Sequence, residues 1–297
     1  MRAAVGVLAL WLAAPVGVAQ TPGPVMVVAA SSRDYLYGAG GTLAQMIAEG
    51  RSVYVLLFGS EDKDAVGLAP ARARLANNAD GERAAKVLGV KEVLSLGYPS
   101  GEFGQISTSE LRNHVMTMFR VWKPEILFFP DWYIHYLDDK DTYWVGRMAE
   151  EAPYGGGSYF LQEMTYIGYP GYAPRQYYFY SPYRPYRPRE GGEGPASFRA
   201  VDITRTMEIK LHAISELKTA NHRYAVETRE RLRAAGRRGK LPEELTPEAA
   251  AKLARAFAEE LAIEIGRKHG FRLGEEFNHL GARPAVPEHV RERARPR

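Results

Sequence analysis

Four short apolar runs alternate with helical patterns in the first half of the chain, and this alternation constrains the fold more than any other feature. The runs are rich in β-branched and aromatic residues: Val25–Ala30, Val53–Phe58, Glu92–Leu96 and Glu125–Phe129. Between them, 71–88 and 109–122 carry apolar residues at three- and four-residue steps. Apolar runs of this length are typical of parallel strands covered on both faces. The sequence predicts an α/β fold, a Rossmann-like open parallel sheet with helices on both faces.

The first predicted strand is followed by a loop and then by the glycine-marked start of a helix, Gly38-Ala39-Gly40-Gly41 before Thr42–Glu49. Because seven residues separate Ala30 from Gly38, these glycines are not a dinucleotide fingerprint, which begins directly after the strand. Ligands of open α/β sheets bind beyond the carboxyl ends of the strands. We therefore expect a site built by the loops after Ala30 and Pro130.

Residues 1–19 have the pattern of a secretory signal peptide. Arg2 precedes an apolar run over 3–16, and Ala19–Gln20 is a suitable cleavage site. The run is shorter than the ~20 residues of a membrane-spanning helix, so no transmembrane segment is expected after cleavage. We expect a periplasmic or secreted protein. Because the chain has no Cys, it forms no disulfides, and any metal must have nitrogen and oxygen ligands.

The composition divides the remaining chain. We expect the α/β domain over 20–222, with a Tyr/Pro/Gly-rich insertion at 154–195, and a basic helical C-terminal extension over 223–297. The insertion includes Gln176–Tyr180, a possible further strand. One helix is predicted from Met207 to about His222, and another from an N-cap at Thr246 to Gly270. The formal charge of +4 is too small to indicate a nucleic-acid partner and is typical of a solvated basic face.

The order of several short motifs resembles one family. The motifs are Gly38–Gly41, Ala84–Val90 with Leu96–Pro99, Lys123–Asp131, and Val201–Thr204 with Lys210–Ala213. Together they resemble the PIG-L/LmbE-like N-acetylglucosaminyl deacetylases, which are zinc hydrolases with a Rossmann-like fold. The resemblance covers about residues 25 to 217. It implies that fold and, where the chemistry is kept, amide hydrolysis of an N-acetylated sugar by metal-activated water.

The residues at the family's catalytic positions differ from the family pattern. Counting back from the glycines, Ser31 stands at the metal-binding His position and Arg33 at the general-base Asp position, whereas Asp34 keeps the second metal-binding Asp. Alignment on Val-Gly-Arg at 145–147 places Thr142 at the other His ligand. Serine and threonine do not replace two imidazoles in a zinc site. These departures from the family pattern lead us to expect a degenerate member with no metal cofactor, and the signal-peptide pattern leads us to expect that it is exported.

A rebuilt metal site is the alternative. Asp34, Asp141 and His135 would be its ligands, for zinc or another divalent metal, and Asp139, at the position of a family His that steadies the oxyanion, would act as the base. The protein would then be an active deacetylase. Against this, we expect Arg33 to form an ion pair with Asp34 or Asp141 in place of the metal.

Aromatic residues surround the predicted pocket mouth. The predicted substrate-binding residues are Arg33, Trp132, Tyr133, Tyr136 and Tyr143. Aromatic faces stack on sugar rings while their polar tips bind hydroxyls, so we expect a carbohydrate or glycoconjugate ligand. A third hypothesis is a protein-interaction module, in which the Tyr-Arg-Pro repeats of 183–189 and the basic helices bind a partner. The oligomeric state stays unpredicted.

Overall fold

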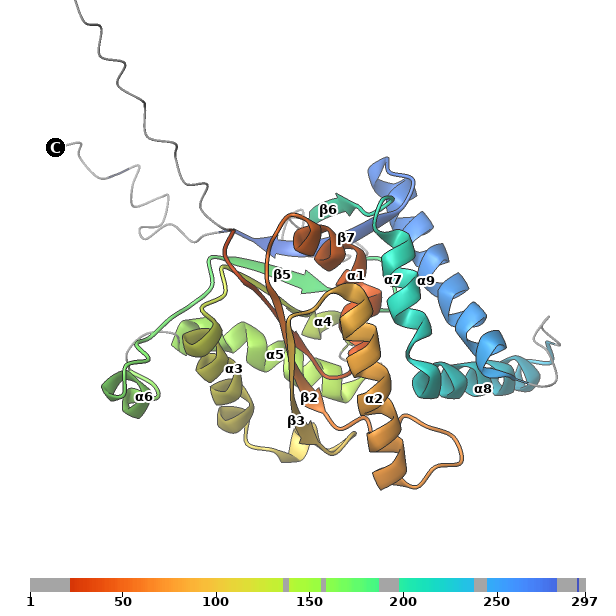
Figure 1. Cartoon of the computed structure of the whole chain (residues 1–297), viewed down its shortest axis with the longest axis horizontal. Coiled ribbons are helices and arrows are strands. Elements are labelled where there is room, and N and C mark those ends of the chain that lie inside the picture. Colours follow the sequence, from red (N-terminus) through yellow and green to blue (C-terminus); the bar gives the residue numbers. More distant parts are fainter. Residues whose placement is uncertain are drawn as a thin grey trace, which may run out of the picture.

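The computed structural model describes residues 22–135, 139–155, 159–186, 198–237, 245–281 and residue 293, without the side chains of 134, 135, 154 and 155. The predicted signal peptide, residues 1–19, lies outside the described residues. A sheet of seven strands runs through the molecule with helices on either side (Figure 1).

The sheet has the strand order β3-β2-β1-β4-β5-β7-β6. Its strands are β1 (Val25–Ala29), β2 (Val53–Gly59), β3 (Glu92–Tyr98), β4 (Ile126–Pro130), β5 (Gln176–Tyr180), β6 (Phe198–Asp202) and β7 (Gly274–Leu280). The strands from β1 to β5 pair in parallel, and β7 pairs antiparallel with both β5 and β6. The sheet is thus mixed. The chain leaves β1 toward β2 and later returns beside β1 as β4, so the strand order reverses between β1 and β4.

Helices cover both faces of the sheet, as predicted. The longer ones are α1 (Ser32–Ala48), α2 (Pro70–Leu88), α3 (Thr108–Trp122), α5 (Lys140–Glu151), α7 (Met207–Ser215), α8 (Lys218–Ala234) and α9 (Pro247–His269). Short helices are α4 (Trp132–His135), α6 (Gln162–Tyr166), η1 (Phe103–Gln105) and η2 (Ala152–Gly155). Thr246 caps α9 by accepting a hydrogen bond from the amide of Ala249, and Gly270 ends it at a φ of 79°.

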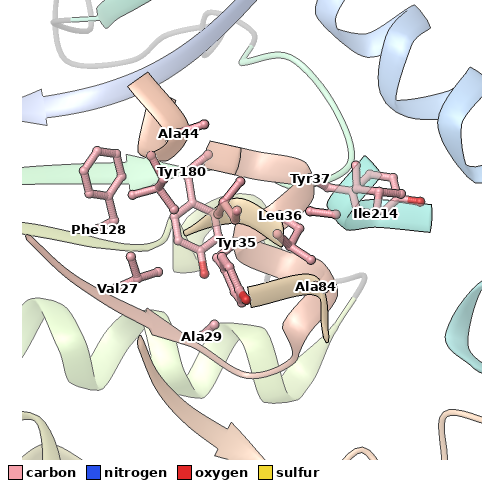
Figure 2. Packing of buried hydrophobic residues seen from close by; sticks show 14 of the residues in the cluster. Val27, Ala29, Tyr35, Leu36, Tyr37, Ala44, Ala84, Phe128, Tyr180 and Ile214 are labelled. Carbon is pink, nitrogen blue, oxygen red and sulfur yellow. The ribbon is translucent and has the colours of Figure 1, made fainter. Parts of the chain in front are cut away.

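Side-chain alternation along the strands divides the interior into two apolar cores. In β1, Val25, Val27 and Ala29 face the core under α1, α2, α7 and α9, whereas Met26 and Val28 face the core under α3 and α5. All five residues are fully buried. Figure 2 shows the first core around β1 and α1. Such continuous burial on both faces explains why β1, β2 and β4 appear in the sequence as apolar runs. The same expectation is wrong for β3, which lies at the edge of the sheet and is mostly exposed.

The glycines of the first motif lie inside α1 rather than before it. The predicted helix start at Thr42 is therefore wrong, because α1 begins ten residues earlier, at Ser32. A Cβ atom on Gly38 would lie 2.6 Å from the ring of Tyr180, and one on Gly41 would lie 2.8 Å from Ile203. The glycines allow α1 to approach the sheet and the segment before α7 closely, and no turn requires them.

The structure also corrects the prediction beyond residue 197. The single helix expected from Met207 to about His222 is broken near Glu216 into α7 and α8. The last part of the chain is more than a helical extension, because β7 enters the sheet between β5 and β6. Both β6 and β7 are additions to the predicted parallel sheet.

Candidate functional site

The candidate site lies at the carboxyl ends of β1 and β4, where the strand order reverses. Open α/β sheets form their ligand crevice at this point. Ser31, Arg33 and Asp34 follow β1, and Asp139 and Thr142 follow β4. The two loops that the sequence predicted to form a site therefore meet.

Asp34 is the centre of a buried hydrogen-bond network. Its Oδ2 accepts hydrogen bonds from the Ser31 amide (2.9 Å) and the Thr142 hydroxyl (3.3 Å), and its Oδ1 accepts one from the Tyr183 hydroxyl (3.1 Å). Asp34 and Thr142 are fully buried. Burial, with the charge of Asp139, outweighs these hydrogen bonds and raises the pKa of Asp34 to about 7.

Asp139 fixes the start of α5 and hence the position of Thr142. Its Oδ1 accepts hydrogen bonds from the amides of Asp141 (3.0 Å) and Thr142 (3.1 Å), as an N-cap residue does. The carboxylate of Asp141 is directed elsewhere. It accepts hydrogen bonds from the amides of Gly101 (2.5 Å) and Phe103 (3.5 Å), in the loop after β3.

Arg33 lies within a cage of three tyrosines, Tyr37, Tyr183 and Tyr224. Its guanidinium carbon is 5.7, 5.7 and 5.4 Å from their ring centroids, within the range of cation–π attraction. Burial alone would lower the pKa of Arg33. The tyrosines, together with Asp64 and Asp34, outweigh that effect, so the pKa is raised and the group stays charged.

The expected ion pair of Arg33 with Asp34 or Asp141 is wrong. The guanidinium makes no hydrogen bond or ion pair with the described part of the chain, and its Nε is covered without an acceptor. The physical reason is that both carboxylates already accept hydrogen bonds from closer donors, chiefly backbone amides.

A second polar layer beside the cage comes from the loop after β2 and from α8. Asp64 pairs with Arg223 of α8, and Arg223 Nε also contacts Glu227 at 2.8 Å. Glu61 accepts hydrogen bonds from the amide (2.8 Å) and hydroxyl (2.7 Å) of Ser32. Burial, with the charge of Asp64, raises the pKa of Glu61 to about 8.

The sequence did not indicate these four residues, although Glu61 and Asp64 could have been found, since they follow a predicted strand at the same sheet edge. Nothing in the sequence marks Arg223 or Glu227, which lie in the segment interpreted as an extension.

The predicted aromatic residues form their own cluster around α4 and α5. Trp132 meets Tyr133 and Tyr143 edge to face, with centroids 6.0 and 5.9 Å apart, and Tyr133 is 49% exposed. The Trp132 indole donates a hydrogen bond to Glu150. Tyr136 and the side chain of His135 lie outside the described residues. The tyrosines that do contact Arg33 come instead from α1, from the segment after β5 and from α8.

Neither a candidate metal-binding cluster nor a helix of membrane-spanning character occurs in the described residues. Nowhere in them do three or more His, Cys, Asp or Glu side chains gather in a way that could hold a metal ion. None of the described helices combines the length and apolar character needed to cross a membrane.

The fold and the position of the site define a Rossmann-like α/β protein with its candidate site at the reversal of strand order. Residues 26–149 match the sequence model of the family described as "PIG-L: GlcNAc-PI de-N-acetylase". Over this segment, which is less than half of the chain, the sequence is similar to that family.

One relative is the diacetylchitobiose deacetylase of Thermococcus kodakarensis, which is 28% identical over 187 residues. That match covers 61% of this chain and 64% of the relative, so the chain spans less than two thirds of the length of this relative.

Solved structures share the fold at lower identity. The N,N'-diacetylchitobiose deacetylase of Pyrococcus horikoshii has a TM-score of 0.68 and 22% identity, over 87% of this chain and 84% of its own. The 4-carboxy-2-hydroxymuconate hydratase of Pseudomonas putida has a TM-score of 0.58 and 17% identity, over 90% and 99%. Since a deacetylase and a hydratase share this fold, the fold alone does not fix the activity.

Proposed function

We propose that this protein is a PIG-L family member that has lost the catalytic metal and binds a carbohydrate or glycoconjugate at the old site. The observation that carries the proposal is the network around Asp34. Ser31, Asp34 and Thr142, which stand at the family's metal-ligand positions, are joined by hydrogen bonds, and Tyr183 completes the set.

This donor set does not fit a zinc ion. Zinc in catalytic sites takes three protein ligands from imidazole, thiolate and carboxylate groups. Of Ser31, Asp34 and Thr142, Asp34 is the one residue of a type that binds zinc. Its two carboxylate oxygens already accept three hydrogen bonds. A metal would have to displace the Thr142 and Tyr183 hydroxyls. Arg33 stands at the base position, where its permanent charge opposes both a cation and the acceptance of a proton.

Sugar binding is supported by the chemical character of the groups at the candidate site. Partly exposed Ser31, Arg33, Asp139, Tyr183 and Tyr224 combine donors, acceptors and aromatic surface, as carbohydrate sites do. The deacetylases similar to this chain are named for diacetylchitobiose, a sugar substrate. We extend the ligand class, and not the reaction, to this protein. Export, predicted from residues 1–19, is part of the same proposal.

The deciding experiment combines metal, activity and binding measurements on the full chain. The protein is purified without chelator, incubated with zinc and analysed for metal content. It is then assayed for acetate release from N,N'-diacetylchitobiose and titrated with the same sugar by calorimetry. We expect neither stoichiometric zinc nor acetate release, and saturable sugar binding.

Two variants make the result specific to Asp34. Asp34→Asn keeps the shape of the side chain, and Glu259→Gln is a matched change of charge on the exposed surface of α9. Acetate release that disappears in Asp34→Asn but not in Glu259→Gln would overturn the proposal in favour of an active deacetylase with a rebuilt metal site. An absence of sugar binding by the wild-type protein would also overturn it.

A further inference from the structure

The guanidinium of Arg33 is a charged group whose donors have no acceptor in the described protein. A guanidinium carries five N–H donors. Arg33 uses none of them on a described residue, and its Nε has no exposed surface. An unsatisfied donor of a charged group costs more than one of a neutral group. Here that cost applies to the covered Nε, because the Arg33 residue as a whole is partly exposed.

The neighbouring carboxylates do not supply the missing acceptor, because each already has donors of its own. Asp34 accepts from an amide and two hydroxyls. Asp64 pairs with Arg223, and Oδ1 of Asp139 accepts from two amides of α5. These carboxylates therefore make their hydrogen bonds without Arg33, although Asp64 and Asp34 also interact with its charge.

The tyrosine cage attracts the charge of Arg33 but does not satisfy its N–H groups. The hydroxyl of Tyr183 donates to Asp34, and that of Tyr37 donates to the carbonyl of Ala254 at 3.4 Å. These two tyrosines therefore present ring faces to the guanidinium. Cation–π attraction holds the group near the rings, and its N–H groups have no acceptor among the described residues.

We propose that Arg33 binds an oxyanion group of the ligand, a carboxylate or a phosphate, so that the ligand is an acidic sugar or an acidic glycoconjugate. This inference rests on the proposed function, because it specifies the ligand of the same site. Planar guanidinium groups bind both kinds of oxyanion through two parallel hydrogen bonds. The charge that replaces the family's general base thus becomes the group that selects the ligand.

The test compares matched sugars on the full-length protein by calorimetry at low salt. The probes are N-acetylglucosamine, N-acetylglucosamine 6-phosphate and glucuronic acid, with inorganic phosphate and acetate as free anions. We expect at least one acidic sugar to bind about tenfold or more tightly than neutral N-acetylglucosamine, which corresponds to about 1.4 kcal/mol. The two acidic sugars distinguish phosphate from carboxylate as the recognised group.

Variants at Arg33 connect this preference to the residue. Arg33→Gln is expected to abolish the acidic preference, and Arg33→Lys to keep part of it, because lysine retains the charge without the planar fork. Arg267→Gln, an equal loss of charge on the exposed end of α9, is expected to change nothing. Circular dichroism and thermal melting show whether each variant is folded. If Arg33→Gln does not fold, the inference is tested by the Arg33→Lys variant and by the binding of the ligand series to the wild-type protein.

The outcomes separate the inference from the proposed function. Equal binding of neutral and acidic sugars overturns the inference and leaves the proposed function standing. An acidic preference that Arg33→Gln retains overturns it as well. So does free phosphate that binds as tightly as the sugar phosphate and independently of Arg33. Failure of every sugar to bind overturns both.

Discussion

Lys210 and Glu275 form a fully buried ion pair, with 2.7 Å between Nζ and Oε1, that contacts both groups of one helical hydrogen bond in α1. Lys210 donates to the carbonyl of Tyr37 at 2.6 Å, and Glu275 accepts from the amide of Gly41 at 2.9 Å. In a regular α-helix that amide and that carbonyl bond to each other. The pair thus ties α7 and β7 to the middle of the helix that begins the candidate site.

Removing one partner of this pair is expected to destabilise the protein strongly. Lys210→Met leaves Glu275 as a buried charge without its cation, and such changes cost about 3–5 kcal/mol. The free energy of unfolding in urea measures the loss. Lys252→Met, on the exposed face of α9, is the control and is expected to change stability by less than about 0.5 kcal/mol. A Lys210→Met variant as stable as the control would contradict the structural importance of the pair.

The same pair explains why the sequence did not predict β7. Gly274–Leu280 contains Glu275 and Glu276, and both are buried. Charged residues are depleted in strands, and here they become tolerable only through distant partners, Lys210 for Glu275 and Lys268 for Glu276. By contrast, β1, β2 and β4 are buried on both faces mainly by apolar side chains. The edge strand β3 is mostly exposed, but its sequence still contains the apolar residues Val93, Leu94 and Leu96. The apolar residues of these four strands are therefore enough to predict the strands from the sequence.

The candidate site, like the sheet, could be predicted from the sequence only in part. That Ser31, Asp34 and Thr142 come together could be expected from the order of motifs, because the loops after β1 and β4 meet at the sheet edge. The cage around Arg33 could not, because Tyr183 and Tyr224 reach it from segments far along the chain whose fold the sequence left open. The ion pair predicted for Arg33 was wrong for a local reason, since backbone amides already bond the carboxylates.

Gly38→Ala tests whether the glycines of α1 serve close packing. Alanine favours an isolated helix by about 1 kcal/mol over glycine. The new Cβ would lie 2.6 Å from the ring of Tyr180, which is fully buried and bonded through its hydroxyl to the carbonyl of Val28. Overpacking of this kind costs about 1–3 kcal/mol. We therefore expect a net loss of stability in urea unfolding, and a gain would show that the helix shifts to accommodate the methyl group.

The raised pKa of Glu61 predicts how stability depends on pH. Burial raises this pKa to about 8 in the folded protein, against about 4.3 in an unfolded chain. Between these values the folded state holds a proton that the unfolded state has released. The contribution of Glu61 is therefore complete below about pH 4 and is lost as the pH rises through 8. Asp34, whose pKa is raised to about 7, acts in the same direction.

Glu61→Gln isolates this contribution because glutamine does not titrate. Relative to the wild type, the variant is expected to gain stability as the pH rises from 5 to 8, by at most about 1.4 kcal/mol per pH unit. Urea unfolding at constant ionic strength and several pH values measures the difference. Glu82→Gln, on the exposed face of α2, serves as the control. A difference between Glu61→Gln and the wild type that stays constant with pH would show that Glu61 is not protonated in the folded protein.

The guanidinium of Arg120 organises the segment around α6, which projects from the body of the molecule (Figure 1). It donates to the carbonyls of Phe160 (2.5 Å), Leu161 (2.7 Å) and Tyr169 (3.3 Å). Arg120→Lys keeps the charge but cannot reach several acceptors at once, and each lost charged hydrogen bond is worth about 1.5–3 kcal/mol. We expect faster amide hydrogen exchange confined to 160–169, with stability elsewhere little changed. Arg74→Lys, on the exposed face of α2, should leave exchange there unaltered. Unchanged exchange in Arg120→Lys would mean that packing, rather than this arginine, orders the segment.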